Sequence, residues 1–230
     1  MSGTSSIAVI GTGNMGRGLA RVLAAAGHTV LLGSREPERA QQLATELGAE
    51  RVRGMRNVEA ASRASIVFLA YHSNDTLVEE LAPVTEGKVV VDISTYHEEP
   101  PPDFNPLTQV PSGSPQERTA SRLPRAHVLG AFQVTWAQLF SEPLLDGRKT
   151  PVFVVGDHAE AKAALLALIR TLPFEPVDAG GLRQARVLAA MYFLVTRLAR
   201  QYGFREHGHD WRTLSRSLNV LLPPALGLRP

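Results

Sequence analysis

The chain has 230 residues, of which 44% are hydrophobic and 20% charged, a composition typical of globular proteins. Its formal net charge is only +2 and its arginines are scattered, so it lacks the basic patch of a nucleic-acid-binding protein. The absence of cysteine excludes disulfides, thiol catalysis and cysteine metal sites.

The ends and the apolar runs of the chain give no sign of a membrane or of export. The N-terminus enters a strand pattern at Ile7 without the features of a signal peptide. The longest apolar run, Val187–Val195, is far shorter than the roughly 20 residues that span a bilayer. We therefore expect a cytoplasmic protein with neither a membrane nor a nucleic-acid partner.

Strand-like and helix-like segments alternate over about the first 180 residues, as in βαβ units. Short apolar runs predict strands at Ile7–Ile10, Thr29–Leu32, Ser65–Ala70, Lys88–Ile93, Val128–Phe132, Val152–Val155 and Glu175–Val177. Apolar stripes predict helices at Met15–Ala26, Pro37–Leu47 and Ala159–Thr171. We expect an α/β fold with a Rossmann-like, doubly wound parallel sheet over residues 1–180.

A proline-rich region interrupts this alternation between Tyr96 and Arg125. Most of it is predicted to be loop, and a loop this long is usually functional or disordered. Within it, Ser114-Pro115-Gln116-Glu117 has the pattern of a capping box with proline at the first helical position, which predicts a short helix.

The residues after Gly181 are predicted to form a small C-terminal helical domain, residues 181–230. A helix is expected from Leu182 to Tyr202, and its centre is apolar on all sides, so it must be buried on every side. A last helix is expected at Trp211–Leu222. Because the chain after the first helix is too short to cover it, we expect a homodimer that buries it.

A glycine-rich loop follows the first predicted strand and opens the first predicted helix. It reads Gly11-Thr12-Gly13-Asn14-Met15-Gly16, the G-x-G-x-x-G pattern in its required context. Gly11 allows a tight turn, Gly13 a close approach of pyrophosphate to the backbone, and Gly16 close packing of helix on strand. The loop indicates a dinucleotide site at a helix N-terminus.

The end of the second strand indicates which dinucleotide binds. NAD-binding chains carry an acidic residue there to hold the ribose hydroxyls. This chain instead has Ser34 and Arg35, and Arg39 follows one helical turn later. Because arginine binds phosphate with two parallel hydrogen bonds, the pattern favours NADP(H), and residues 1–180 are expected to be the NADP-binding domain.

Other candidate residues follow from the ends of the strands, where ligands bind in this fold. His72 follows the third apolar strand, and Ser94 follows the fourth, where the nicotinamide is expected. His207 and His209 are too few for a metal site, and none is expected. No pattern of a catalytic acid, base or nucleophile is present. This fits hydride transfer between two stacked rings, for which the protein supplies mainly orientation.

Several motifs together resemble the NADPH-dependent coenzyme F420 reductases and the cytosolic reductase domain of the six-transmembrane metalloreductases. They are the segments 10–20, Gly27-His28, Gly33-Ser34-Arg35, Val154-Val155-Gly156-Asp157 and Pro176-Val177-Asp178-Ala179-Gly180. The resemblance implies that Thr12, Ser34, Arg35 and Arg39 surround the 2′-phosphate. It also implies that Ala70 and Tyr71 border the dinucleotide, and that Ala131, Phe132 and Gln133 lie by the nicotinamide.

The implied activity is hydride transfer between NADPH and a second redox partner, coenzyme F420 or a flavin (FMN or FAD), with ferric iron as a further acceptor. The acceptor wall is expected to come from the C-terminal helices and from Gly180, Gly181 and Leu182. Two alternatives remain open: an NADPH-dependent reductase of a small carbonyl or imine, and a redox sensor that binds NADP(H) without consuming it.

Overall fold

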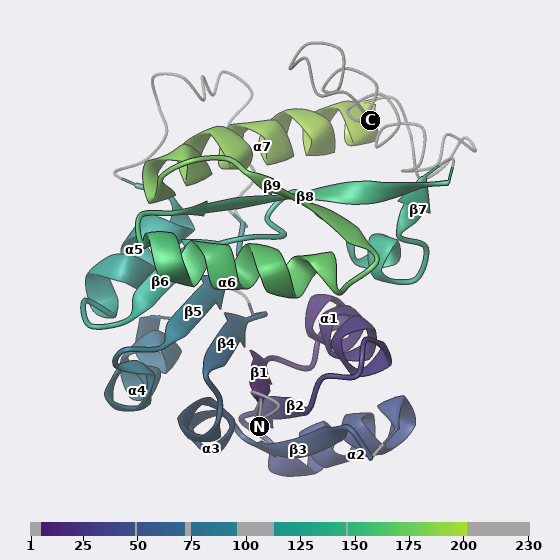
Figure 1. Ribbon diagram of the computed structural model, residues 1–230, viewed down its shortest axis with the longest axis vertical. Coiled ribbons are helices and arrows are strands. Elements are labelled where there is room, and N and C mark those ends of the chain that lie inside the picture. The colour runs from purple at the N-terminus through teal and green to yellow at the C-terminus, as the bar shows by residue number, and fades with distance from the viewer. Residues whose placement is uncertain (1–5, 49, 72–74, 96–112, 146, 202–230) are drawn as a thin grey trace.

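The computed structural model describes residues 6–48, 50–71, 75–95, 113–145 and 147–201 (Figure 1). Its sheet begins with six parallel strands in the order β3-β2-β1-β4-β5-β6. These strands are β1 (Ile7–Ile10), β2 (Val30–Ser34), β3 (Val52–Arg56), β4 (Ile66–Leu69), β5 (Val89–Asp92) and β6 (His127–Gly130). This is the strand order of a dinucleotide-binding Rossmann fold, which confirms the predicted fold class.

Both faces of the sheet are buried because successive strand residues alternate between two cores. In β1, Ile7 and Val9 pack into one hydrophobic cluster, while Ala8 and Ile10 pack into another. The first cluster is covered by α1 (Asn14–Ala25), α2 (Pro37–Leu47) and α6 (Ala159–Arg170). The second is covered by α3 (Asn57–Arg63) and α4 (Asp75–Thr85). Such double burial explains why these strands read as continuous apolar runs.

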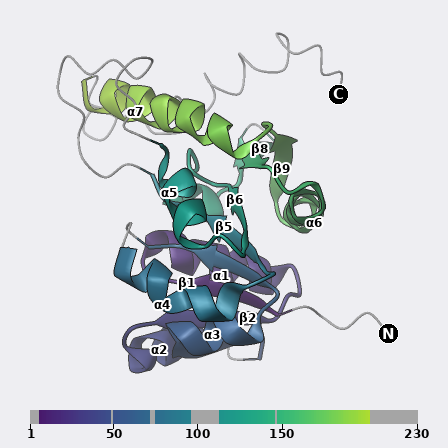
Figure 2. The same cartoon turned by 90° about the vertical axis from the view of Figure 1, so that its left-hand side faces the viewer.

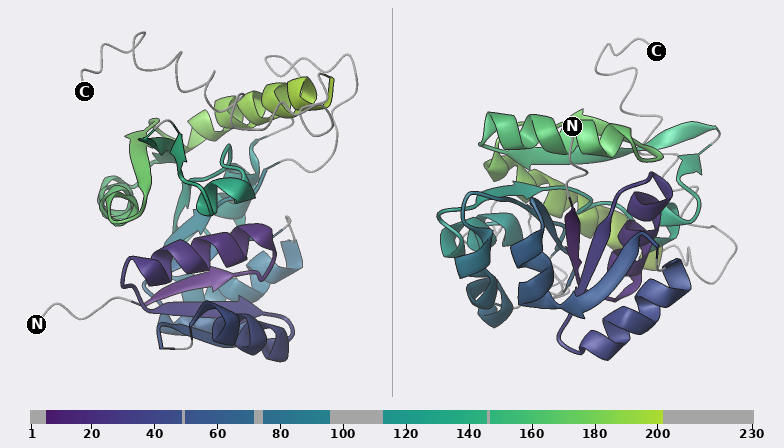
Figure 3. Two further views of the ribbon diagram at one scale, coloured as in Figure 1. Left: turned by 90° about the vertical axis from the view of Figure 1, so that its right-hand side faces the viewer. Right: turned by 60° about the horizontal axis from the view of Figure 1, so that its bottom comes forward.

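Beyond β6 the sheet departs from the parallel arrangement of the Rossmann core. Strand β8 (Arg148–Gly156) pairs antiparallel with β6, and β7 (Leu144–Leu145) forms a hairpin with it. The reason is the connection, since β6 is followed by the short 3-10 helix η1 (Ala137–Phe140) rather than by an α-helix that crosses the sheet. Strand β9 (Phe174–Asp178) then pairs parallel with β8, and α6 runs alongside both (Figure 3).

The C-terminal part of the described chain lies at the end of the molecule opposite α2 and α3 (Figure 2). A 3-10 turn, η2 (Leu182–Gln184), leads into α7 (Ala185–Gln201). Leu188 and Ala189 of α7 are buried, but Val187 is 55% and Leu194 59% exposed. Among the described residues α7 therefore leaves these two apolar side chains uncovered, and the burial of the whole helix in a homodimer stays a prediction. The predicted helix at 211–222 lies outside the described residues.

The remaining predicted elements agree with the structure to within a few residues. Strands β3 and β7 and helices α3 and α4 are not among the elements predicted from the sequence. The capping box is confirmed: Ser114 and Glu117 cap each other at the start of α5 (Pro115–Arg122). Within the described ranges, no helix combines the length and the hydropathy that crossing a membrane requires.

Candidate active site

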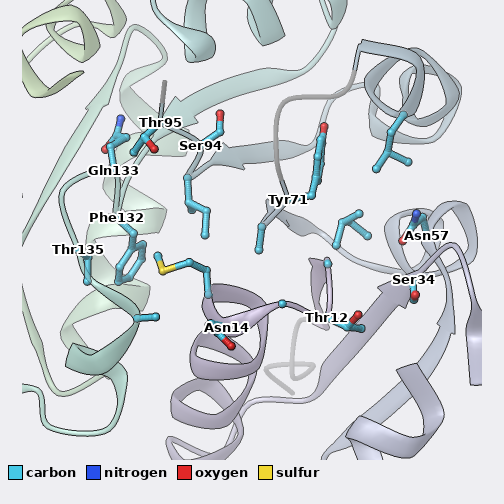
Figure 4. Close-up of a pocket in the computed structure, with 18 of the residues that line it drawn as sticks. Thr12, Asn14, Ser34, Asn57, Tyr71, Ser94, Thr95, Phe132, Gln133 and Thr135 are labelled. Atoms are coloured by element: carbon cyan, nitrogen blue, oxygen red, sulfur yellow. The ribbon is translucent and has the colours of Figure 1, made fainter. Parts of the chain in front are cut away.

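A cleft of about 1040 Å³ opens where β1, β2, β4, β5 and β6 end (Figure 4). Most residues predicted for the site line it: Gly11, Thr12, Gly13, Asn14, Met15, Ser34, Arg35, Arg39, Ala70, Tyr71, Ser94, Phe132 and Gln133. The carboxyl ends of parallel strands meet at one edge of the sheet, which is why segments from across the chain converge here. His72 lies outside the described residues, as do His207 and His209.

The glycine loop is shaped by close backbone contacts. Gly11 has φ +125°, and a Cβ there would lie 2.2 Å from the carbonyl oxygen of Ala70. A Cβ on Gly16 would lie 2.0 Å from the carbonyl oxygen of Gly11, so Gly16 serves packing and does not line the cleft. A Cβ on Gly13 would meet nothing within 4 Å. Gly13 therefore leaves space open at the N-terminus of α1, which no side chain caps.

One end of the cleft has a hydroxyl from the last residue of β2 and two guanidinium groups, one from the turn after β2 and one from α2. The buried Ser34 accepts a hydrogen bond from the backbone N–H of Glu36 at 3.1 Å, which fixes the turn into α2. Arg35 and Arg39 are exposed and line the cleft, and neither has an acidic partner within the described part of the chain. Asn57, at the start of α3, also lines this end, and its buried Oδ1 has no hydrogen-bond partner.

Tyr71 borders the middle of the cleft, directly after β4. Burial, together with the negative charges of Asp92 and Asp75, raises the pKa of its phenol far above the ordinary value of 10.0. The phenol is therefore protonated at neutral pH and is a hydrogen-bond donor toward the cleft.

A buried polar network lies beneath Ser94. The Asp92 carboxylate, 3% exposed, accepts hydrogen bonds from the Ser94 backbone N–H at 2.8 Å, the Ser94 hydroxyl and the Thr119 hydroxyl. Gln116 donates to the Ser94 carbonyl oxygen at 2.7 Å. Because Ser94 donates its only hydroxyl proton to Asp92, its hydroxyl presents an acceptor to the cleft.

The segment after β6 forms the other end of the cleft and has two unusual properties. Phe132 has φ +61°, a strained conformation for a bulky residue, and its ring is buried among Phe68, Phe140 and Phe174. Gln133 is 3% exposed, yet neither its amide nitrogen nor its amide oxygen has a hydrogen-bond partner. Nearby, the buried hydroxyl of Thr135 also lacks a partner. Buried polar groups without a protein partner need a water or a ligand to pair with them, and these two line the cleft.

The structure places Ala131 differently from the prediction. Its side chain is 0% exposed, belongs to the core and does not line the cleft. The alternation along the strand explains this, since Ala131 faces the same side as Leu129, another core residue.

Sequence reasoning missed part of the lining. Trp136, directly before η1, and Tyr192, in α7, both line the cleft. Their ring centroids lie 6.4 Å apart and their planes make an angle of 36°. Arg118 of α5 lines it as well. Trp136, three residues beyond Gln133, could have been found by extending the nicotinamide segment. No signal in the sequence indicates which face of α7 meets the cleft, so Tyr192 could not have been found.

The family comparison gives one match over the N-terminal part of the chain. Residues 6–96 match the model of the family described as NADP oxidoreductase, coenzyme F420-dependent. A crystal structure from Arthrobacter sp. FB24, of a protein assigned as an F420-dependent NADP reductase, is 28% identical with a TM-score of 0.70. The match covers 86% of this chain and 95% of the Arthrobacter chain. These matches confirm the resemblance indicated by the motifs.

Curated relatives include metalloreductases. Metalloreductase STEAP3 of Rattus norvegicus is 31% identical over 190 residues, and Metalloreductase STEAP2 of Homo sapiens is 27% identical over 182 residues. The matches cover 80% and 79% of this chain but only 36% and 34% of the relatives, so the chain spans about a third of their length. An imine reductase structure from Pseudomonas sp., 18% identical with a TM-score of 0.60 over 98% of this chain and 74% of that chain, shows likeness of fold alone.

Proposed function

We propose that the cleft of this chain transfers hydride between NADP(H) and a deazaflavin (coenzyme F420) or a flavin (FMN or FAD), a proposal supported by the match of residues 6–96 to the family described as NADP oxidoreductase, coenzyme F420-dependent. The observation that carries this proposal is the continuity of the cleft. A phosphate-binding end, built on the glycine loop, leads directly to an end with two aromatic rings and a buried amide without partners.

The residues at the β2 end fit the 2′-phosphate and pyrophosphate of NADP(H). The open space at Gly13 and the uncapped N-terminus of α1 suit the pyrophosphate, which accepts hydrogen bonds from free backbone N–H groups. Arg35 and Arg39, which pair with no acidic side chain among the described residues, suit the 2′-phosphate, with Thr12 and Ser34 as hydroxyl donors. The cleft has no acid at the tip of β2 itself, where an NAD-selective site carries one, although Glu36 follows in the turn.

The residues at the β6 end fit the nicotinamide. Its carboxamide has one acceptor and two donors, which is the complement of the unpaired amide of Gln133 and the acceptor presented by Ser94. Trp136 and Tyr192 supply an aromatic wall for a planar acceptor ring. When bound, NADPH supplies the hydride. The protein binds the two rings, holds their reacting carbons within about 3–3.5 Å and excludes water.

The test is reaction of the purified chain with NADPH and a panel of acceptors, followed by stopped-flow absorbance. F420, FMN or FAD should oxidise NADPH at a rate that Trp136→Ala lowers through a higher KM for the acceptor. The Kd of NADPH should stay the same in this variant. Ferric chelate added with flavin tests onward electron transfer to iron. Binding of NADPH without consumption with any acceptor would contradict the proposal and favour a redox sensor.

A second candidate function, reduction of a small carbonyl or imine, is favoured by one observation. Tyr71 lines the cleft, and its phenol can donate a proton to the oxygen or nitrogen that hydride transfer makes basic. Tyr71→Phe distinguishes the two functions, because it should abolish carbonyl or imine reduction and leave flavin reduction nearly unchanged.

The domain division and the oligomer belong to the same proposal. Residues 1–180 would bind NADP(H), and residues 181–230 would complete the acceptor wall and the dimer. The supporting observation is the exposure of Val187 and Leu194, seven residues apart on one face of α7. Light scattering should give the mass of two chains for the wild type and of one chain for Val187→Glu. The mass of one chain for the wild type at micromolar concentration would refute the homodimer.

A further inference from the structure

Arg118 lines the cleft from α5, far from the two arginines that fit the 2′-phosphate. Arg35 and Arg39 follow β2, on one side of the central strand β1, whereas α5 follows β5, on the other side. Arg118 also lines a small adjoining pocket with Tyr71, Asp92 and Ser94. The cleft therefore has a third guanidinium group apart from Arg35 and Arg39, and the 2′-phosphate of NADP(H) does not account for it.

The acidic groups around Arg118 are engaged elsewhere. Asp75, which lines both cavities, forms an ion pair with Arg122. Glu117 accepts two hydrogen bonds of 2.8 Å from Arg186. The Asp92 carboxylate is buried and accepts its hydrogen bonds from Ser94 and Thr119. Within the described ranges no acidic side chain pairs with Arg118, so its exposed guanidinium is available to a ligand.

The chemistry of the proposed acceptors supplies a group for this guanidinium. FMN, FAD and F420 all carry a phosphate on a flexible side chain attached to the planar ring. A ring that reaches the nicotinamide near Ser94 lies close to the residues that share a pocket with Arg118. Arginine binds phosphate with two parallel, charge-assisted hydrogen bonds, and a ring without the phosphate makes neither.

We propose that Arg118 binds the side-chain phosphate of the acceptor, so that the site selects phosphorylated flavins and deazaflavins over the same rings without phosphate. This inference rests on the proposed function and adds to it the feature by which the acceptor is recognised. It assigns to Arg118 a specificity role and no part in the hydride step itself.

The test compares FMN with riboflavin, which have the same ring and differ in the phosphate. Binding to the full chain saturated with NADP⁺ is measured by quenching of flavin fluorescence, and kcat/KM is measured with NADPH. The wild type should bind FMN at least about tenfold more tightly than riboflavin, and added salt should reduce the difference. Arg118→Gln should remove the preference and leave riboflavin binding unchanged, while Arg118→Lys should restore part of it.

Arg125→Gln is the matched control, because Arg125 pairs with Glu86 and does not line the cleft. It removes the same charge and should keep the preference for FMN. F420 and its phosphate-free ring fragment form a second matched pair of ligands. The pair that shows the larger preference for the phosphorylated form tells whether the site recognises a flavin or a deazaflavin. Thermal unfolding of each variant confirms that it is folded.

The failure of this inference is distinguishable from the failure of the proposed function. Equal binding of the phosphorylated and phosphate-free rings by the wild type, with normal hydride transfer to both, would overturn the role of Arg118 alone. An equal loss for both rings in Arg118→Gln would also overturn it, since the phosphate would not be the recognised group. If no ring of either pair were bound or reduced, the proposed function and this inference would fail together.

Discussion

The two ends of the cleft are built in different ways. Apart from Asn57, the end at β2 consists of backbone turns, free N–H groups and exposed arginines from one stretch between Gly11 and Arg39. The end at β6 consists of side chains from separate segments, among them Ser94, Gln133 and Tyr192. A site made of backbone suits one fixed ligand, whereas a site made of side chains can change its ligand by substitution. A substitution at the β6 end is therefore expected to change the acceptor and not the cofactor.

The largest effect is expected on NADPH affinity, from substitutions of two glycines of the loop: Gly13 leaves space for the ligand, whereas Gly16 allows close packing within the protein. Gly13→Ala should lower NADPH affinity by more than about a hundredfold, because its Cβ occupies the space into which the pyrophosphate fits. Its melting temperature should equal that of the wild type, since that Cβ meets no protein atom within 4 Å. Gly16→Ala, the matched control, should unfold at lower temperature because its Cβ meets the Gly11 carbonyl. Normal NADPH binding by Gly13→Ala would mean that the pyrophosphate lies elsewhere.

The second effect tests the charge at the β2 end. Arg35→Ala should weaken NADPH binding by about 1.5–3 kcal/mol, the range of hydrogen bonds to charged groups. NADH lacks the 2′-phosphate, so its affinity should be nearly unchanged. Titration calorimetry with both cofactors measures the two affinities. A wild type that binds NADH as tightly as NADPH would contradict this account of cofactor choice.

A smaller effect, of opposite sign for stability and function, is expected at the β6 end. Gln133→Met keeps the length of the side chain and removes a buried amide without partners, so the free protein should gain about 1 kcal/mol. Hydride transfer should slow by about tenfold, because the nicotinamide is less well positioned. In Gln116→Met the amide removed is hydrogen bonded to Ser94, so this control should be less stable than the wild type. Destabilisation by both substitutions would show that Gln133 serves the fold.

The smallest effect concerns how the melting temperature changes at low pH, because Glu117 of α5 pairs with Arg186 of α7. Burial would raise the pKa of Glu117, but hydrogen bonds from Arg186 and from the Ser114 backbone outweigh it, so the pKa lies below its ordinary value of 4.5. A carboxyl group whose pKa is lower in the folded state stabilises the fold above its ordinary pKa, and this stabilisation is lost as the pH falls through the folded value. The melting temperature should therefore fall below about pH 4.5. Glu117→Gln should make this fall less steep.

How far the sequence predicts the structure differs between the two ends of the cleft. The glycine loop, Ser34 and Arg35 are predictable because their chemistry depends on neighbours in the chain. Tyr192 and Arg118 are not, because their place depends on how α7 and α5 dock on the sheet. Strand β3 escaped prediction because it lies at the sheet edge and its exposed arginines, Arg53 and Arg56, stand three residues apart, so the segment has neither a continuous apolar run nor a period of two. The side chain of Ala131 was misplaced although the strand period assigns it to the core.

The unpaired amide of Gln133 also has a consequence for stereochemistry. A nicotinamide carboxamide paired with this fixed amide and with the Ser94 acceptor has one orientation, so the ring presents one face to the aromatic wall and the other to the protein core. Only one of the two diastereotopic hydrogens at the reduced carbon of the ring then faces the acceptor. NADPH deuterated in one of the two positions should pass its deuterium to the acceptor, and NADPH deuterated in the other should keep it.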